Sequence, residues 1–346
     1  MSASQIALPR VDALPPWQQR VHAHAARSLD SGGMGHALLL CGPALIGKRV
    51  VAECLARRLL CQVRGAGLDA CGHCRSCTLF DQRYQTEPLA SRPDGRPAHP
   101  FGQCAHPDAS FVGFEVNDKA RPPRVRTEIV IEQVRVLSEK LTLTPQYGGA
   151  QVVIVDPADA LNHHACNALL KTLEEPRPGR YLWLLAANPM RLPATIRSRC
   201  QRQEFPLPPR EEALQWLRAQ GHAENVGSEA LEAARGHPVL ADAWLRDGGM
   251  ALRRAVADDL ARLARDGAAV LETAKQWTGD EHAILRLRLA ADLAVASAAG
   301  LTDPLRTRKL AAWFDTANRT RELLGTTVRA DLAVAELLLD WVKVRA

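Results

Sequence analysis

Short apolar runs that alternate with amphipathic segments mark the first half of the chain. Ala37–Cys41, Val152–Val155 and Tyr181–Ala187 are apolar at every position, as in strands that are buried on both faces of a parallel sheet. Lys48–Leu60 and Ile129–Leu141 carry apolar residues at helical spacing. The alternation predicts an α/β fold with a parallel sheet covered on both faces by helices. Further expected elements are a helix at Trp17–Ser28, a strand at Phe111–Val116 and a helix at about Ala160–Glu174.

The second half of the chain shows helical spacing only. No strand pattern follows Ala187. The pattern divides the chain into an α/β domain at 1–207, a small helical block at 208–247 and a larger helical block at 248–346, with a break at Asp247-Gly248-Gly249. The helices expected in the two blocks are Glu211–Ala219, Ser228–Ala234, Pro238–Arg246, Ala251–Ala264, Ala283–Ala299, Leu305–Leu324 and Asp331–Val344.

The composition is that of a globular protein with two or three domains. The chain has 346 residues, of which 47% are hydrophobic and 24% charged. The net charge of +6 permits contact with nucleic acid, but a solvated surface explains it equally well. Met1–Arg20 lacks a basic start followed by an apolar run, and no apolar stretch reaches the length of a membrane span. We therefore expect a cytoplasmic protein without membrane contact.

A glycine-rich loop connects the first expected strand to the next helix. Gly42-Pro43-Ala44-Leu45-Ile46-Gly47-Lys48 matches the pattern G-x-x-x-x-G-K. In such a loop, successive backbone N–H groups and the helix N-terminus hold phosphate oxygens, and the lysine reaches the terminal phosphates. Gly42, Gly47 and Lys48 are therefore candidate phosphate-binding residues. The alternative is that the loop is only a tight turn between a strand and a helix.

Two departures weaken the nucleotide chemistry of this loop. The residue after the lysine is normally Ser or Thr, whose hydroxyl binds Mg²⁺, but here it is Arg49. Asp156 ends an apolar strand in the position of a metal-facing carboxylate, but Pro157 follows it where hydrolytic proteins place a glutamate. We therefore predict a degenerate site that binds ATP weakly or not at all, and no independent ATPase activity.

Four of the nine cysteines lie close together after the loop's helix. Cys61, Cys71, Cys74 and Cys77 have the spacing C-x9-C-x2-C-x2-C, and C-x-x-C turns present two sulfurs to one ion. Four thiolates close a tetrahedral shell, so the segment 61–77 predicts a structural Zn²⁺ site without an open position for catalysis. A redox pair or unliganded thiols are the alternatives. Residues 86–107, rich in Pro, Gly and charge, are expected to form an irregular insertion.

Two further runs complete a family resemblance. They are Asn167-Ala168-Leu169-Leu170-Lys171-Thr172-Leu173-Glu174-Glu175-Pro176 and Leu192-Pro193-Ala194-Thr195-Ile196-Arg197-Ser198-Arg199-Cys200. With the glycine loop and the cysteine cluster, in this order and spacing, the chain resembles the clamp-loader branch of the AAA+ proteins, which serves bacterial DNA polymerase III. The resemblance implies an AAA+ P-loop domain with an inserted zinc knuckle, an all-α lid at 208–247 and an all-α collar for oligomerisation at 248–346.

The resemblance also implies a function. The chain is expected to be a non-hydrolysing subunit that helps to load the sliding clamp onto primed DNA. Its partners would be the tau/gamma and delta subunits, the clamp and the DNA, within a DNA-directed DNA polymerase (nucleotidyltransferase) holoenzyme. The triplet Ser198-Arg199-Cys200 matches a family motif, which implies that Arg199 is an arginine finger acting in trans on ATP held by a neighbouring tau or gamma subunit.

Further departures favour the assisting role over two alternatives. Active clamp-loader ATPases carry a polar sensor residue before Asn188-Pro189, but this chain has Ala186-Ala187 there. In the lid, active subunits have an arginine after a glycine near the start of a helix, but no arginine is present in Gly236-His237-Pro238-Val239. The first alternative is an active clamp-loader ATPase of the gamma type. The second is a zinc-dependent nucleic-acid-binding module with a vestigial nucleotide fold, although the basic residues are interspersed with acidic ones.

Overall fold

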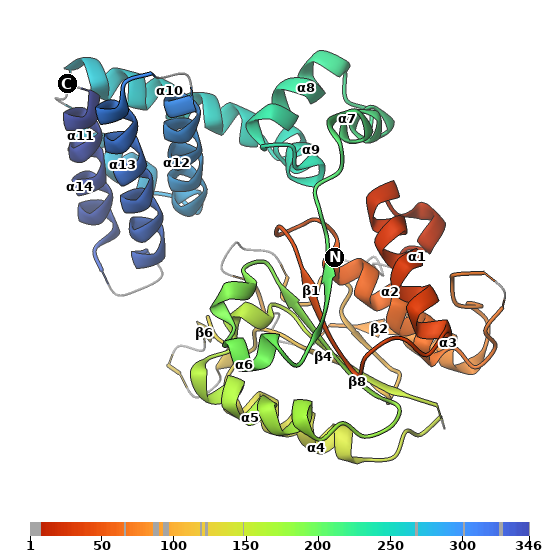
Figure 1. The fold of residues 1–346 in the computed structure, drawn as a ribbon. Coiled ribbons are helices and arrows are strands. Elements are labelled where there is room, and N and C mark those ends of the chain that lie inside the picture. The colour runs from red at the N-terminus through yellow and green to blue at the C-terminus, as the bar shows by residue number, and fades with distance from the viewer. Residues whose placement is uncertain are drawn as a thin grey trace. The chain divides into compact units, whose positions relative to one another are not determined.

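The chain folds into two compact units. The computed structural model describes residues 8–345 except 66, 86–89, 93–96, 118–119, 122–123, 148, 267–268, 300–301 and 325–327. The first unit comprises Met1–Glu224 and Ala234–Val239, and the second comprises Asn225–Ala233 and Leu240–Ala346 (Figure 1).

A five-stranded sheet forms the centre of the first unit. Its order is β4-β7-β8-β1-β9, and every neighbouring pair is parallel. This confirms the predicted parallel sheet, but the expectation that no strand follows Ala187 was wrong. The last strand was missed because its four residues are polar and lie at the edge of the sheet, where an apolar pattern is not required. The strands are β1 Ala37–Cys41, β4 Ala109–Val112, β7 Gln151–Val155, β8 Arg180–Ala186 and β9 Gln201–Glu204.

Helices cover both faces of this sheet, as the apolar strands predict. Alternate residues of a strand point to opposite faces, so Ile154 of β7 packs in one core cluster and Val153 in another. The first cluster includes residues of α1 and α2, and the second includes residues of α4, α5 and α6 (Figure 1). These helices are α1 Pro16–Asp30, α2 Lys48–Leu60, α4 Ile131–Thr142, α5 His163–Glu174 and α6 Ala194–Arg197.

Several short elements surround the sheet. The strand expected at Phe111–Val116 divides, because β4 ends at Val112 and Val116 begins a separate hairpin. The cysteine segment continues into a helix that was not expected, and one short strand lies within the insertion 86–107, part of which lies outside the described residues. The short elements are η1 Val11–Ala13, α3 Arg75–Asp81, β2 Arg83–Tyr84, β3 Gln103–Cys104, β5 Val116–Asn117, β6 Arg124–Val125, η2 Ala158–Ala160 and η3 Pro189–Arg191.

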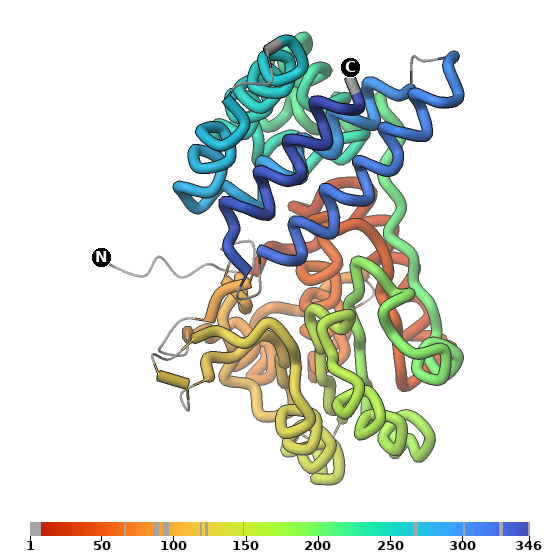
Figure 2. The backbone as a smooth tube through the Cα atoms, turned by 90° about the vertical axis from the view of Figure 1, so that its left-hand side faces the viewer, coloured from red at the N-terminus to blue at the C-terminus, as the bar shows by residue number. Residues whose placement is uncertain are grey.

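The remainder of the chain is helical, as expected. In the second unit α12, α13 and α14 lie side by side (Figures 1 and 2). Trp313 and Trp341 pack there with ring centroids 4.7 Å apart. No described helix has the length and apolar character needed to cross a membrane. The helices are α7 Arg210–Ala219, α8 Glu224–Ala233, α9 Pro238–Arg246, α10 Gly249–Asp266, α11 Val270–Thr278, which was not expected, α12 Ala283–Ala299, α13 Pro304–Leu323 and α14 Ala330–Arg345.

Candidate functional site

The glycine loop connects β1 to α2 in a conformation that requires both glycines. Gly42 and Gly47 have φ angles of 152° and 105°, values that residues with a side chain rarely adopt. A Cβ atom on Gly42 would lie 2.6 Å from Phe205 O, and one on Gly47 would lie 2.1 Å from Gln18 Nε2. The backbone therefore follows the predicted strand–loop–helix path, but the side chain of Gln18 packs directly against it.

Lys48 is directed at its own loop. Its Nζ donates hydrogen bonds to Gly42 O at 2.6 Å and to Pro43 O at 2.7 Å. Burial lowers the pKa of Lys48 to about 8, against the opposing effect of the nearby carboxylates of Asp156 and Asp159. The lysine that would reach the terminal phosphates of a nucleotide thus satisfies two loop carbonyls instead.

Donors from other segments satisfy two further carbonyls of the loop. Gln18 Nε2 and Trp17 Nε1, both on α1, donate to Ile46 O at 3.0 and 3.3 Å. His237 Nε2 lies 2.7 Å from Ala44 O. Because α1 and the turn before α9 contact the loop directly, its conformation is fixed by groups of this chain.

Two guanidinium groups approach the carboxylate that corresponds to the metal-facing aspartate. Asp156 Oδ2 forms an ion pair with Arg92 NH2 at 2.6 Å and lies 3.7 Å from Arg49 NH1. Arg49 also pairs with Glu53, and its guanidinium lies 4.6 Å from the ring centroid of Phe111. Two positive groups beside one carboxylate repel a divalent cation, so this arrangement opposes Mg²⁺ binding at Asp156.

Glu53 and Arg83 extend the charge network from Arg49 into the core. Glu53 is fully buried and accepts from Arg83 NH1 at 2.6 Å as well as from Arg49. Burial, together with the positive charge of Arg49, lowers the pKa of His99 to about 4, so this ring is neutral at pH 7. The motifs identify Arg49 and Asp156, but they give no sign of Arg92, which comes from the segment expected to be an irregular insertion.

The four predicted zinc ligands lie together. Their sulfur atoms are all within 4.8 Å of one another. Cys61 and Cys74, and likewise Cys71 and Cys77, have Sγ atoms 3.9 Å apart. A tetrahedral zinc ion with bonds of about 2.3 Å requires sulfur separations of about 3.8 Å. Backbone N–H groups also donate to three of the sulfurs, from Cys71 to Cys61 at 3.5 Å, from Cys74 to Cys71 at 3.3 Å and from Cys77 to Cys74 at 3.4 Å. The donor set therefore fits a metal ion.

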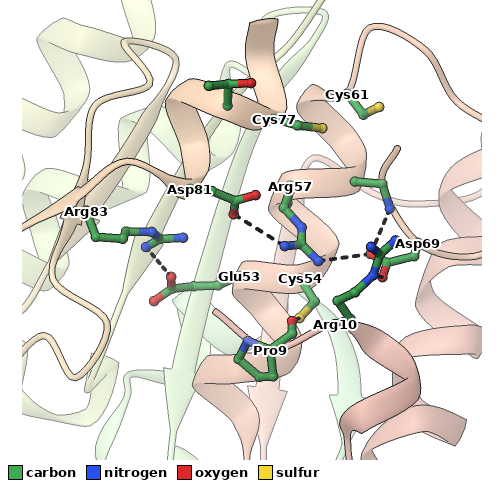
Figure 3. A network of polar contacts seen from close by, with 12 residues as sticks. Pro9, Arg10, Glu53, Cys54, Arg57, Cys61, Asp69, Cys77, Asp81 and Arg83 are labelled. Carbon is green, nitrogen blue, oxygen red and sulfur yellow. Dashed lines mark hydrogen bonds and ion pairs between the residues drawn. The ribbon is translucent and has the colours of Figure 1, made fainter. Parts of the chain in front are cut away.

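Ion pairs attach this cysteine module, residues 61–81, to α2. Arg57 pairs with Asp69 at 3.1 Å and with Asp81 at 3.3 Å, and lies between the two carboxylates (Figure 3). Arg58 donates to Gly67 O and pairs with Asp30, each at 2.6 Å. Arg49, Glu53 and Arg57 recur every fourth residue along α2, and Cys61 follows the end of the helix, so this row of residues runs from the glycine loop to the cysteines.

A buried Ser–His–Asp group near the module does not have the geometry of a hydrolase. His106 Nε2 lies 2.6 Å from Ser76 Oγ, but the backbone N–H of Asp108 donates to His106 Nδ1 at 3.1 Å. Nδ1 is therefore the acceptor and Nε2 carries the proton, so the ring cannot take a proton from Ser76. Ser76 donates instead to Leu60 O at 2.6 Å, which fixes α3 to the end of α2.

Arg199 follows α6 on the surface of the first unit. Its side chain is 37% exposed, with NH2 2.7 Å from Glu174 Oε1 and NH1 donating to Thr195 O at 2.8 Å. Ser198 is exposed and donates to Thr195 O at 3.2 Å, while Cys200 is half-buried. Among the hydrogen bonds and ion pairs of the described residues, those of Arg199 go to Thr195 and Glu174, not to the glycine loop or Asp156.

Comparison with known proteins assigns the family. A family model described as DNA polymerase III, delta subunit, matches residues 17–209, which is more than half of the chain. The DNA polymerase III subunit delta' of Pseudomonas aeruginosa is 35% identical over 264 residues, which are 76% of this chain and 70% of that protein. The chain belongs to the DNA polymerase III delta' subunit family. The predicted resemblance is confirmed.

This delta' family member is also similar to another delta' subunit, to a tau subunit and to a solved structure. The Escherichia coli delta' subunit is 31% identical over 71% of this chain and 65% of its own length, so the chain spans about two thirds of these relatives. The E. coli tau subunit is 33% identical over 53% of this chain and 23% of its own length. Among solved structures, a gamma subunit-related protein of Thermotoga maritima aligns with 94% of this chain and 99% of its own, at 14% identity and a TM-score of 0.48.

Proposed function

We propose that this delta' family member is a non-hydrolysing subunit of the DNA polymerase III clamp loader. It assembles with tau/gamma and delta subunits, takes part in placing the sliding clamp on primed DNA, and supplies Arg199 to ATP bound by a neighbouring tau or gamma subunit. The family assignment supports membership of this complex. The geometry around Asp156 supports the non-hydrolysing role, and that around Arg199 supports the role in trans.

The observation that carries the non-hydrolysing role is the double guanidinium at Asp156. Arg92 and Arg49 supply the positive charge that Mg²⁺ supplies in an active site. Lys48 is at the same time bonded to two loop carbonyls. A magnesium–nucleotide complex would have to displace both cations and the lysine before it could bind. This chain therefore contributes to ATP hydrolysis only through its surface.

Arg199 is the surface group with the right chemistry. A guanidinium offers fixed N–H donors to the charge that builds on a transferred phosphoryl group. Its exposure of 37% leaves part of the group accessible to an adjacent subunit. The triplet Ser198-Arg199-Cys200 thus acts in trans, and the rival reading, an active ATPase of the gamma type, is opposed by the filled site around Asp156.

The cysteine module takes a structural role. Cys61, Cys71, Cys74 and Cys77 hold one Zn²⁺ in a closed shell, which leaves no position for substrate or water. The ion fixes the module against α2, where Arg57, Arg58 and the hydrogen bond from Ser76 to Leu60 O provide further contacts.

The test is nucleotide binding and turnover by the purified chain, alone and with partner ATPase subunits. Alone, the chain is expected to show neither heat of binding nor hydrolysis with magnesium–ATP. Mixed with tau or gamma, delta, clamp and primed DNA, it should raise ATP hydrolysis by the partner. Turnover by the isolated chain at about 1 s⁻¹, a modest but ordinary enzymatic rate, would contradict the proposal.

A further inference from the structure

Two segments of the same unit hold the guanidinium of Arg199 in place. NH1 donates to the carbonyl of Thr195 in α6 at 2.8 Å. NH2 forms an ion pair at 2.7 Å with Glu174, the last residue of α5. Contacts at two nitrogens of a planar group fix both its position and the direction of its plane. The other N–H donors of the fork remain for a second acceptor.

The ion pair between Arg199 and Glu174 is too exposed to contribute much to the stability of the folded chain. The side chains of Arg199 and Glu174 are 37% and 49% exposed, and pairs of this kind contribute little to folding because water and salt screen them. An arginine free in solvent, however, moves among many rotamers and must lose that freedom when it meets a phosphate. Holding it beforehand removes part of this cost at the moment of reaction.

We propose that Glu174 is a positioning residue that holds Arg199 in the orientation needed to contact the triphosphate of a neighbouring subunit. This inference rests on the proposed arginine-finger role. Glu174 reaches no phosphate itself, because its carboxylate would be repelled by it. Glu174 acts only through Arg199, which the carbonyl of Thr195 also holds. Glu174 belongs to the family run that extends from Asn167 to Pro176.

The chain offers a matched control one residue further on. Glu175 is also exposed and its backbone N–H donates to Lys171 O at 3.1 Å, and no ion pair of its carboxylate is found among the described residues. Glu174→Gln and Glu175→Gln remove the same charge from the same turn, but only Glu174→Gln removes the ion pair. An exposed pair of this type affects an equilibrium or a rate by about two- to five-fold.

The experiment uses the reconstituted clamp loader with primed DNA and clamp, at equal assembly for all variants. ATP hydrolysis is measured as kcat and KM for wild type, Glu174→Gln, Glu175→Gln, Arg199→Ala and the double variant Glu174→Gln/Arg199→Ala. The part of kcat that Arg199→Ala abolishes is the contribution of the site that faces this subunit. Glu174→Gln is expected to lower that part about two- to five-fold without changing KM, because the finger acts in the transition state.

The variants separate this proposal from the one on which it rests. Glu175→Gln should match wild type, and Glu174→Gln should add no loss to Arg199→Ala, since a residue that acts only through Arg199 has no further effect once Arg199 is absent. Equal rates for the two glutamine variants, a higher rate for Glu174→Gln, or an added loss in the double variant would overturn the positioning role. An unchanged rate for Arg199→Ala would overturn the arginine finger itself, and the positioning role with it.

Discussion

Replacing Arg57 by Met tests whether ion pairs, rather than apolar packing, attach the cysteine module to α2. Arg57 is 6% exposed and pairs with Asp69 at 3.1 Å and with Asp81 at 3.3 Å. Methionine keeps most of the aliphatic length and removes the charge. The module's own apolar cluster is small and consists of Cys61, Ala70 and Cys77, with Cys71 and Cys74 packed against them. Phe80, near the end of the module, is fully buried in the core cluster that includes residues of α2, and Arg57→Met leaves that packing intact.

The expected cost of Arg57→Met follows from the exposure of the partners. Removing one member of a fully buried pair costs about 3–5 kcal/mol, and a fully exposed pair is worth about 0–1 kcal/mol. Asp69 and Asp81 are 22% and 37% exposed, so water can rehydrate both carboxylates. Asp69 also keeps a hydrogen bond from Val11 N at 3.2 Å. We therefore expect a loss of about 2 kcal/mol in the free energy of unfolding.

The assay is thermal unfolding of Arg57→Met beside the control Arg64→Met. For a unit of this size, about 2 kcal/mol lowers Tm by roughly 4–8 °C. Arg64 is exposed and donates to Leu59 O at 2.8 Å, so its replacement should change the free energy by no more than about 0.5 kcal/mol. Equal Tm values for the two variants would refute the reasoning, because the ion pairs would then contribute nothing to the attachment.

Three further predictions concern the metal, the nucleotide position and pH. Metal analysis should find one zinc per chain, retained in Cys166→Ser and lost in Cys74→Ser, because Cys166 lies outside the cluster; zinc-free wild type would contradict this. Arg49→Ser should not restore magnesium–ATP binding in calorimetry, because Arg92 still pairs with the carboxylate; micromolar binding would show that Arg49 alone blocks the site. Burial lowers the pKa of His22 to about 4. Between this value and its ordinary pKa of about 6.5, His22 is protonated in the unfolded chain but not in the folded one. The free energy of unfolding therefore decreases as the pH falls below 7. The loss is about 2 kcal/mol between pH 7 and 5, and denaturant unfolding should show a flatter profile for His22→Leu; an identical profile would contradict the assignment.

The sequence predicted the centre of the sheet well and its edge poorly. β1, β7 and β8 are buried on both faces and therefore carry apolar runs that identify them. β9 was missed because its residues are polar, and an edge strand needs backbone pairing with only one neighbour. α3 was missed because the cysteine spacing suggested a continuous knuckle, whereas Cys74 serves as the N-cap of a helix by accepting from Cys77 N.

The candidate site was predictable only where its residues form a motif. Sequence patterns identify the residues that directly follow an apolar strand, namely Gly42, Gly47, Lys48 and Arg49 after β1 and Asp156 after β7. The groups that fill the site come from distant segments without a pattern, namely Gln18 in α1 and Arg92 in the insertion. Their approach depends on tertiary packing, which no local signal records.

The hydrolysis rate of a reconstituted loader with Arg199→Ala tests the central claim most directly. The control is Arg202→Ala, which removes another arginine from the surface of the same unit, 59% exposed and paired with Glu204. At the ATP site that faces this subunit, loss of an arginine finger should reduce hydrolysis by about 10³–10⁵-fold, while Arg202→Ala should match wild type. If stimulated hydrolysis and clamp loading are the same for both variants at equal assembly, Arg199 does not act on a neighbouring nucleotide.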